Sequence, residues 1–219
     1  GVAHDFNNLL TAILGNVDLM LHGDPGAKAD PARLRAVRDA AVRAADLADQ
    51  LRACSGGIIL ELEPVDLGQL VTSATQVFKA SPSPRPAVQW DLAPSLPLVQ
   101  GDGTQLGQVV MNLLLNAADA MVGGAGKIVI STRRVTATAT QLGRGMVVDA
   151  PPPGAYVRLS VADEGQGMAP VIKARVFDPF FTTKAKGGGL GLAVVLGIVR
   201  AHGGTIAVTS EPGAGTRFD

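Results

Sequence analysis

Residues 112–120 read NLLLNAADA, inside an apolar segment, 101–122, that predicts a helix capped by Asp102. Asn112 and Asn116 stand four residues apart, so they share one face of that helix among apolar neighbours. A buried amide needs hydrogen-bond partners, and an asparagine oxygen is a neutral ligand that suits a hard cation such as Mg²⁺. The stretch therefore predicts either two satisfied structural amides or one wall of a metal-dependent site.

Two glycine-rich segments follow this helix. In DEGQGM a predicted strand ends at Asp163, and Gly165 and Gly167 come directly after it. Glycines there let the backbone approach a flat ligand, and a carboxylate at a strand end can accept a hydrogen bond from an exocyclic amine. The segment GGGLGLAVV places further glycines before a predicted helix, whose free N–H groups favour phosphate. These glycines are Gly187, Gly188, Gly189 and Gly191. Taken alone, each segment is also consistent with a simple turn or a flexible loop.

The region that contains these segments, from Gly57 onward, alternates short strands with helices. Strands are predicted at 127–134 and 155–162, and a helix capped by Asp66 precedes them. The Pro- and Gly-rich segment between the two strands is expected to be a mobile hairpin loop. Mixed strands and helices with hairpin links predict an α+β fold, in which helices cover one face of a sheet.

The first 57 residues follow a helical pattern instead. Apolar residues gather on one side of a predicted helix over 2–21, and His4 and Asn8 fall on the opposite side. A second helix is predicted from Pro31, with an alanine-rich apolar seam. Two helices with single apolar faces bury those faces poorly as an isolated hairpin. The pattern therefore predicts a homodimer, in which two chains build a four-helix bundle.

Composition narrows the classes of partner. Lys and Arg number 19, and so do Asp and Glu, so no overall field recruits nucleic acid or anionic lipid. The single cysteine, Cys54, excludes an intramolecular disulfide and fits a reducing compartment. No apolar run reaches the roughly 20 residues of a membrane span. We therefore expect no nucleic-acid partner, no membrane contact by this part of the chain, and a cytoplasmic location, alone or as part of a larger membrane-attached protein.

Five motifs in order, HDFNN, NLLLNAADAM, DEGQGM, VFDPFFTTK and GGGLGLAVV, resemble the H, N, G1, F and G2 boxes of bacterial sensor histidine kinases. Their wording is most similar to the group, often hybrid kinases, in which His is followed by Asp-Phe-Asn-Asn. The resemblance implies a dimerisation and histidine-phosphotransfer hairpin over 1–57. It also implies that 58–219 form a catalytic ATP-binding domain of the Bergerat type, shared with type II topoisomerases and related chaperones.

The resemblance also implies roles for three residues of the first motif. His4 would be the phosphoacceptor. An imidazole attacks phosphorus through a neutral nitrogen, so the adjacent Asp5 would hold the proton on the other ring nitrogen and stabilise the developing charge. Asn8, one helical turn beyond His4, would position groups near the histidine and orient a water for the reverse, phosphatase reaction.

The nucleotide-binding roles follow from the other motifs. By resemblance, Asn116 would be the Mg²⁺ ligand, Asp163 would accept from the adenine amine, and 177–191 would be the ATP lid, anchored by Phe177 and Phe180. The complete set of expected nucleotide-binding residues is Asn112, Asn116, Asp163, Gly165, Gly167, Met168, Phe177, Thr183, Lys184, Gly187, Gly188, Gly189, Leu190 and Gly191. In one departure from the family pattern, Ala118 and Asp119 stand where many relatives carry a basic residue.

The sequence thus predicts an ATP- and Mg²⁺-dependent protein histidine kinase of a two-component system. It would phosphorylate His4 and pass the phosphoryl group to an aspartate on a response-regulator receiver domain. One alternative is an ATPase clamp of the same nucleotide-binding class, but such proteins carry a Glu where this chain has Asn112. The other alternative is a non-catalytic dimeric scaffold or phosphotransfer module.

Overall fold

The computed structural model describes residues 2–21, 32–38, 40, 41, 44, 60–80, 86–121, 126–143, 151–184 and 189–219. The predicted first helix is confirmed as α1 (Val2–Leu21), and residues 32–38 are also helical. The connection between these helices lies outside the described residues, as does the predicted boundary at residue 57. No helix among the described residues is both long enough and apolar enough to cross a membrane.

Part of the apolar side of α1 is exposed in the single chain. Leu14, on the predicted apolar side, is 60% exposed, and Leu10 on the same side is 38% exposed. The predicted dimeric four-helix bundle is not evident in the part of this single chain that the structure describes.

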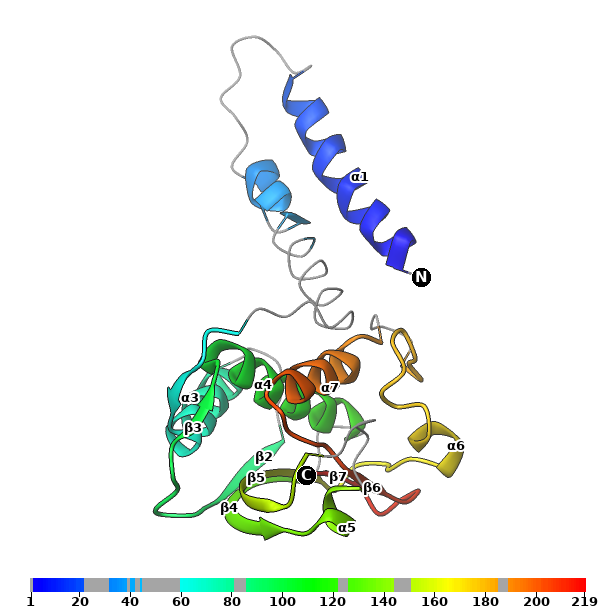
Figure 1. The fold of residues 1–219 in the computed structure, drawn as a ribbon. Helices are drawn as coiled ribbons and strands as arrows, with labels where there is room; N and C mark the ends of the chain where they lie inside the picture. Colours follow the sequence, from blue (N-terminus) through cyan, green and yellow to red (C-terminus); the bar gives the residue numbers. More distant parts are fainter. Residues whose placement is uncertain are drawn as a thin grey trace.

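Strands build a mixed sheet. In chain order they are β1 (Glu63–Val65), β2 (Ala87–Leu92), β3 (Val99–Gly101), β4 (Lys127–Ala137), β5 (Gly154–Asp163), β6 (Val208–Ser210) and β7 (Thr216–Phe218). Within the described residues, the main sheet has the order β2-β4-β5-β7-β6 (Figure 1). β2 and β4 are parallel, and the other neighbours are antiparallel. β1 and β3 form a separate antiparallel pair.

Helices cover one face of this sheet (Figure 1). They are α3 (Leu67–Lys79), α4 (Gly103–Ala120) and α7 (Gly191–Ala201), with the short helices α5 (Ala139–Leu142) and α6 (Pro170–Lys173) elsewhere. Val110 and Leu114 of α4 meet Ile128 and Ile130 of β4 in one apolar core, and all four are 0% exposed. Each such side chain contributes about 1.5–3 kcal/mol when fully buried. The predicted α+β layering is confirmed.

Two helix caps are as the sequence predicts. The Asp66 carboxylate accepts hydrogen bonds from the backbone N–H groups of Gly68 and Gln69 at the start of α3. Asp102 accepts from the N–H of Gln105 at the start of α4. In each case the carboxylate satisfies donors that have no partner within the helix.

The prediction for the segment between the two central strands is partly wrong. β4 continues to Ala137, and α5 follows it directly. The reason is local: Thr138 and Gln141 form a reciprocal capping box, which nucleates a helical turn. Residues 144–150, the centre of the predicted mobile loop, lie outside the described residues.

Candidate functional site

The C-terminal half of α4 brings several predicted site residues together. The side-chain amide of Asn112 donates to the carbonyl oxygen of Gly191 over 3.3 Å. The Oδ1 atom of Asn116, one turn later, accepts from the ammonium of Lys184 over 3.0 Å. The same ammonium lies 2.8 Å from an Asp119 carboxylate oxygen. Asn112 therefore fixes the start of α7, and its predicted contact with a ligand stays a prediction.

The start of α7 lies against both asparagines. A Cβ atom at Gly191 would be 3.9 Å from Asn112 and 3.9 Å from Asn116, so the helix begins directly beside these amides. Leu190 is the N-cap residue and is 3% exposed, and its side chain gives no capping hydrogen bond. First-turn N–H groups without a side-chain cap are suited to an anion, and the helix dipole adds to this preference.

Asp163 ends β5 and is 9% exposed. Its carboxylate accepts from the N–H of Gly165 over 2.8 Å. Burial raises the pKa of Asp163, and the N–H groups of Gly165 and Thr216 oppose that rise. A carboxylate offers about four lone-pair sites, so a group that accepts two backbone hydrogen bonds can still accept one from an amine.

The glycines of this segment are required by contacts within the protein. A Cβ at Gly165 would lie 2.8 Å from the Ala120 side chain of α4. Gly167 has φ +64°, and a Cβ there would lie 1.9 Å from the carbonyl oxygen of Glu211. Both glycines pack the segment between the end of α4 and the β6–β7 turn. Their predicted close approach to a ligand stays a prediction.

The neighbouring Met168 is also tied to this turn. Its backbone N–H donates to the Ser210 hydroxyl over 2.8 Å, and the N–H of Gln166 donates to the carbonyl of Ala120 over 3.0 Å. Ser210 in turn contacts the carbonyl of Gly215. The segment after Asp163 is therefore held from two sides, which fixes the carboxylate at the end of its strand.

The aromatic motif divides into buried and exposed rings. Phe177 is 6% exposed and meets Phe218 edge to face, with ring centroids 6.1 Å apart. Phe181 lies beneath the guanidinium of Arg175, 4.4 Å from ring centroid to Cζ. Phe180 is 45% exposed, so the expectation that it anchors this segment is wrong. Only Phe177 of the two is packed in the core.

The backbone explains the position of Phe180. It has φ +67°, and its N–H donates to the carbonyl of Gly189 over 2.9 Å. A Cβ at Gly189 would lie 2.5 Å from the Phe180 carbonyl carbon. This backbone contact turns the Phe180 side chain outward. Thr183 is exposed, and Gly187 and Gly188 lie outside the described residues.

The helix α1 carries the three residues predicted for phosphoryl transfer. His4, Asp5 and Asn8 lie within its range, Val2–Leu21, but their side chains lie outside the described part of the structure. Their roles stay predictions.

Sequence reasoning missed the contact of Asp119 with Lys184. The position of Asp119, three residues after Asn116, places it on the same helix face.

His202 has a structural role. It is the C-cap residue of α7. Its Nε2 accepts from the backbone N–H of Asp102 over 3.0 Å, and its Nδ1 donates to the carbonyl of Ile198 over 2.8 Å. Both ring nitrogens are therefore engaged: the Nε2 contact ties the end of α7 to the start of α4, and the Nδ1 contact lies within α7.

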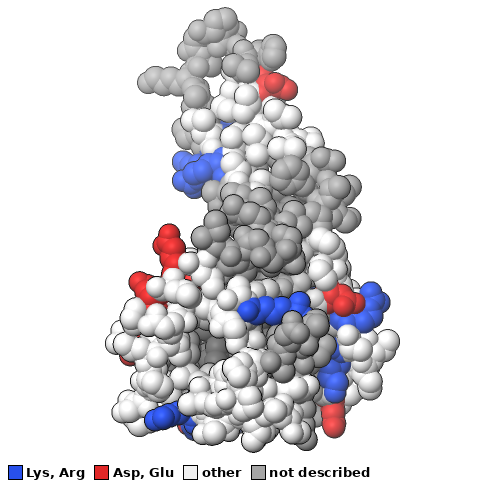
Figure 2. All heavy atoms as spheres, in the orientation of Figure 1, with Lys and Arg blue, Asp and Glu red and all other residues white. Residues whose placement is uncertain are grey.

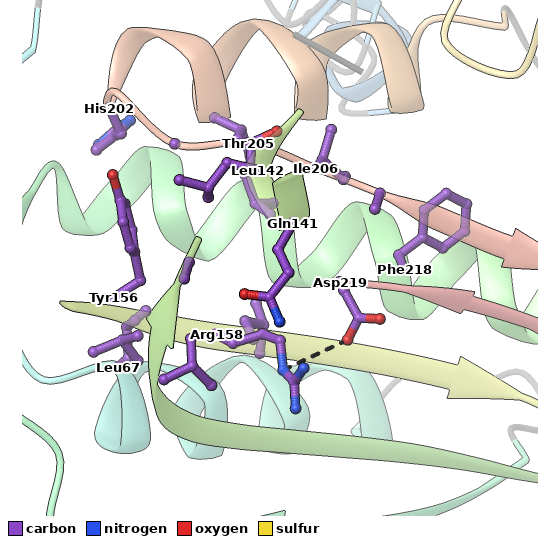
Figure 3. A pocket seen from close by; sticks show the side chains of 18 of the residues that line it. Leu67, Gln141, Leu142, Tyr156, Arg158, His202, Thr205, Ile206, Phe218 and Asp219 are labelled. Atoms are coloured by element: carbon purple, nitrogen blue, oxygen red, sulfur yellow. Dashed lines mark ion pairs between the residues drawn. The ribbon is translucent and has the colours of Figure 1, made fainter. Parts of the chain in front are cut away.

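A cavity of about 610 Å³ lies at the other end of the helices (Figure 3). Tyr156, Arg158 and His202 are among its polar lining residues, and most of the remaining lining is apolar. Tyr156 lies near the start of β5, whereas Asp163 is the last residue of that strand. None of the predicted site residues lines this cavity, so we do not assign the nucleotide to it.

Charge is dispersed over the face of the molecule drawn in Figure 2, where acidic and basic side chains alternate. The local arrangement at the end of α4 is more specific. An amide oxygen, a carboxylate, a buried strand-end aspartate and an uncapped helix start lie around one end of the helical layer. This is a suitable chemical environment for a cation, phosphates and an amino-substituted ring.

Comparisons with known proteins identify the family to which this chain is similar. Residues 101–219 match the family described as histidine kinase-, DNA gyrase B- and HSP90-like ATPases. Among curated relatives, Sensor kinase CckA of Brucella abortus (strain 2308) is 37% identical, over 100% of this chain and 23% of its own length. Sensor histidine kinase ZraS of Escherichia coli (strain K12) is 34% identical, over 100% of this chain and 43% of its own length.

Solved structures give the same result. The crystal structure of full-length ShkA in complex with AMPPNP has a TM-score of 0.66 and 27% identity, and the match covers 98% of this chain and 43% of that one. The mycobacterial sensor histidine kinase MprB has a TM-score of 0.55 and 27% identity, with 72% and 93% covered. The chain thus spans less than half the length of CckA and ZraS.

The fold and site define an α+β nucleotide-binding domain of the Bergerat type, with a mixed sheet under a helical layer. The chain belongs to the family of histidine kinase-, DNA gyrase B- and HSP90-like ATPases. Within that family, its curated relatives are named sensor kinases and sensor histidine kinases.

Proposed function

We propose that this chain is the catalytic core of an ATP-dependent protein histidine kinase that phosphorylates His4. The observation that carries the proposal is the extent of the matches. The ATPase family covers only 101–219, whereas the sensor kinases match the whole chain, including the helix that carries His4. A clamp-type ATPase would share the nucleotide-binding part alone.

The first helix would supply the chemistry at the acceptor. A neutral nitrogen of His4 attacks the γ-phosphorus, and the carboxylate of Asp5 holds the proton on the opposite ring nitrogen. Asn8 would place a water for the reverse reaction. Positioning and charge neutralisation account for most of the catalysis in phosphoryl transfer. The site on α4 would supply both.

The residues on α4 fit a hard cation. Asn116 and Asp119 already direct oxygen atoms at one positive charge, the Lys184 ammonium. We therefore propose that Asn116 holds Mg²⁺, which would neutralise charge on the phosphates of the bound nucleotide. The carboxylate of Asp163 would accept from the adenine amine, and the uncapped start of α7 would face the phosphates.

We further propose a homodimer built by residues 1–57, with 58–219 as the catalytic domain. The exposed Leu10 and Leu14 of α1 support this assembly, because a partner chain would cover them. The phosphoryl group would pass from His4 to an aspartate of a response-regulator receiver domain. ATP and receiver domains of this kind are cytoplasmic, so the reaction would take place in the cytoplasm.

Labelling with radioactive ATP tests the proposed reaction. Incubation with Mg²⁺ and γ-labelled ATP is expected to give protein-bound label that is lost in acid and kept in alkali, the signature of a phosphohistidine. α-Labelled ATP is the matched control and is expected to leave no label. Acid-stable label, or no label on protein that binds ATP, would contradict the kinase proposal.

Replacement of Asp163 by asparagine is expected to weaken ATP binding about tenfold or more, because a charge-assisted hydrogen bond to the adenine amine is lost. The fold should persist, since the amide oxygen can still accept from the N–H of Gly165. Isothermal titration with ADP measures the affinity, and circular dichroism verifies the fold. An unchanged ADP affinity would show that Asp163 does not bind the base.

The same variant gives a test of pH dependence. Because burial raises the pKa of Asp163, the folded protein holds this proton more tightly than the unfolded chain does. The stability that the folded protein gains from protonated Asp163 is therefore present at low pH. It is lost as the pH rises from the ordinary carboxyl range through the raised pKa. Thermal unfolding of Asp163→Asn at several pH values should lack this component.

A further inference from the structure

The ammonium of Lys184 bridges two oxygen atoms of α4. Its Nζ lies 3.0 Å from Oδ1 of Asn116 and 2.8 Å from Oδ2 of Asp119. The side chains of Lys184 and Asp119 are 37% and 53% exposed, so solvent and solutes can reach the pair. Two oxygens that converge on one positive charge form the first part of a cation site.

The position on the helix strengthens this assignment. Asn116 and Asp119 are three residues apart near the end of α4, which finishes at Ala120. The end of a helix carries partial negative charge from its free carbonyl groups and favours a cation. The last turn of α4 contains no basic residue of its own, and Lys184 supplies that charge from a distant part of the chain.

We propose that Asn116 and Asp119 together form a two-oxygen cation site, which the Lys184 ammonium occupies until Mg²⁺ arrives with the nucleotide. The inference rests on the proposed function, because it takes Asn116 as the metal ligand. It adds the Asp119 carboxylate as a second protein ligand of the site. The Lys184 ammonium is then a displaceable counterion of the two oxygens.

Charge repulsion favours the displacement. Mg²⁺ binds oxygen at about 2.0–2.1 Å and repels a neighbouring ammonium, so binding of Mg²⁺ at the Asn116 oxygen favours release of Lys184. Mg²⁺ in nucleotide enzymes is bound by one or two protein oxygens together with phosphate oxygens and water. Asn116 and Asp119 can therefore supply the whole protein share of the ligands.

The Lys184 ammonium is held weakly because it is partly exposed. Ion pairs between exposed side chains contribute little to stability, so Mg²⁺ needs only modest binding energy to displace the ammonium. Removal of the ammonium is consequently expected to raise the affinity of the nucleotide-free protein for a divalent cation by about two- to fivefold. The uncompensated carboxylate of Asp119 acts in the same direction.

The experiment measures Mn²⁺ binding to the nucleotide-free protein by electron paramagnetic resonance of free Mn²⁺. Lys184→Met is expected to bind Mn²⁺ about two- to fivefold more tightly than the parent chain. Lys127→Met is the matched control, because it removes a lysine from another ion pair, the one with Glu164. The control shows what the loss of one positive charge does when the ion pair of Lys184 with Asp119 is left in place.

A second variant identifies the oxygens. Adding Asp119→Asn to Lys184→Met is expected to remove the gain in Mn²⁺ affinity. The inference would be overturned by equal Mn²⁺ affinity in the parent and Lys184→Met, by the same gain in Lys127→Met, or by a gain that persists without the Asp119 carboxylate. Circular dichroism confirms that each variant is folded.

The outcome is separable from the proposed kinase activity. Suppose that the parent chain is labelled at His4 and that Lys184→Met does not change the Mn²⁺ affinity. These results would overturn the role proposed for Lys184 and leave the kinase assignment in place. The expected Mn²⁺ result in a chain that forms no phosphohistidine would support the two-oxygen site and contradict the kinase assignment.

Discussion

Replacement of Gly167 by alanine is expected to destabilise the catalytic domain by about 3 kcal/mol or more. Gly167 has φ +64°, and a Cβ there would lie 1.9 Å from the carbonyl oxygen of Glu211 and 2.8 Å from its carbonyl carbon. Both neighbours are backbone atoms, so no side-chain rotation relieves the clash. The β6–β7 turn must move away from the segment after Asp163.

Denaturation with urea measures this effect, and Gly107→Ala is the matched control. Gly107 lies within α4, and a Cβ there would meet nothing within 4 Å. Alanine at that position is expected to stabilise the helix by about 0.5–1 kcal/mol. A Gly167→Ala protein with the stability of the parent would contradict the packing described for this segment.

Replacement of Asn116 by alanine is expected to reduce Mg²⁺-dependent ATP binding about a hundredfold or more, since even outer-shell partners of a metal are worth 10- to 100-fold. Label transfer should fall to background. Asn116 is only partly buried, and its amide oxygen contacts the exposed Lys184, so the fold should persist.

Titration of the nucleotide with and without Mg²⁺ separates metal binding from base binding. In Asn116→Ala the Mg²⁺-dependent part of the affinity should disappear, and the Mg²⁺-independent part should stay. Thr104→Ala, at the exposed opposite end of α4, controls for a general effect on the helix. Equal Mg²⁺ dependence in the parent and Asn116→Ala would contradict the assignment of the metal ligand.

The features that the sequence predicts well depend on neighbouring residues. Asp66 and Asp102 are aspartates directly before apolar periodic segments, and each caps its helix through a residue two or three positions away. The central strands are predicted because β-rich segments are bounded by turn residues, although β4 extends three residues beyond the predicted Arg134. Local chemistry decides these elements.

The features that sequence reasoning misses depend on contacts between distant segments. Lys184 reaches Asp119 across 65 positions in the chain, and no local pattern indicates that pairing. Phe180 is turned outward by its backbone hydrogen bond with Gly189. Gly167 has its packing role only because the β6–β7 turn lies against it. In each case tertiary packing decides the conformation.

The order of the five motifs indicates the nucleotide-binding class, and contacts between distant segments bring the motifs together. The glycine segment after Asp163 packs against the end of α4, one turn beyond Asn116, and so brings Asp163 close to that helix end. This contact joins the end of β5, at Asp163, to the end of α4, at Ala120.

The identity of the phosphorylated residue tests the central claim most directly. The chain contains three histidines, His4, His22 and His202. After incubation with ATP and Mg²⁺, mass spectrometry of peptides prepared at neutral to alkaline pH is expected to show one phosphohistidine, at His4. It should be absent from His4→Ala. His202 should be unmodified, since both of its ring nitrogens are engaged. Phosphate on His22 or His202, or an unmodified His4 in protein that binds ATP, would contradict the account.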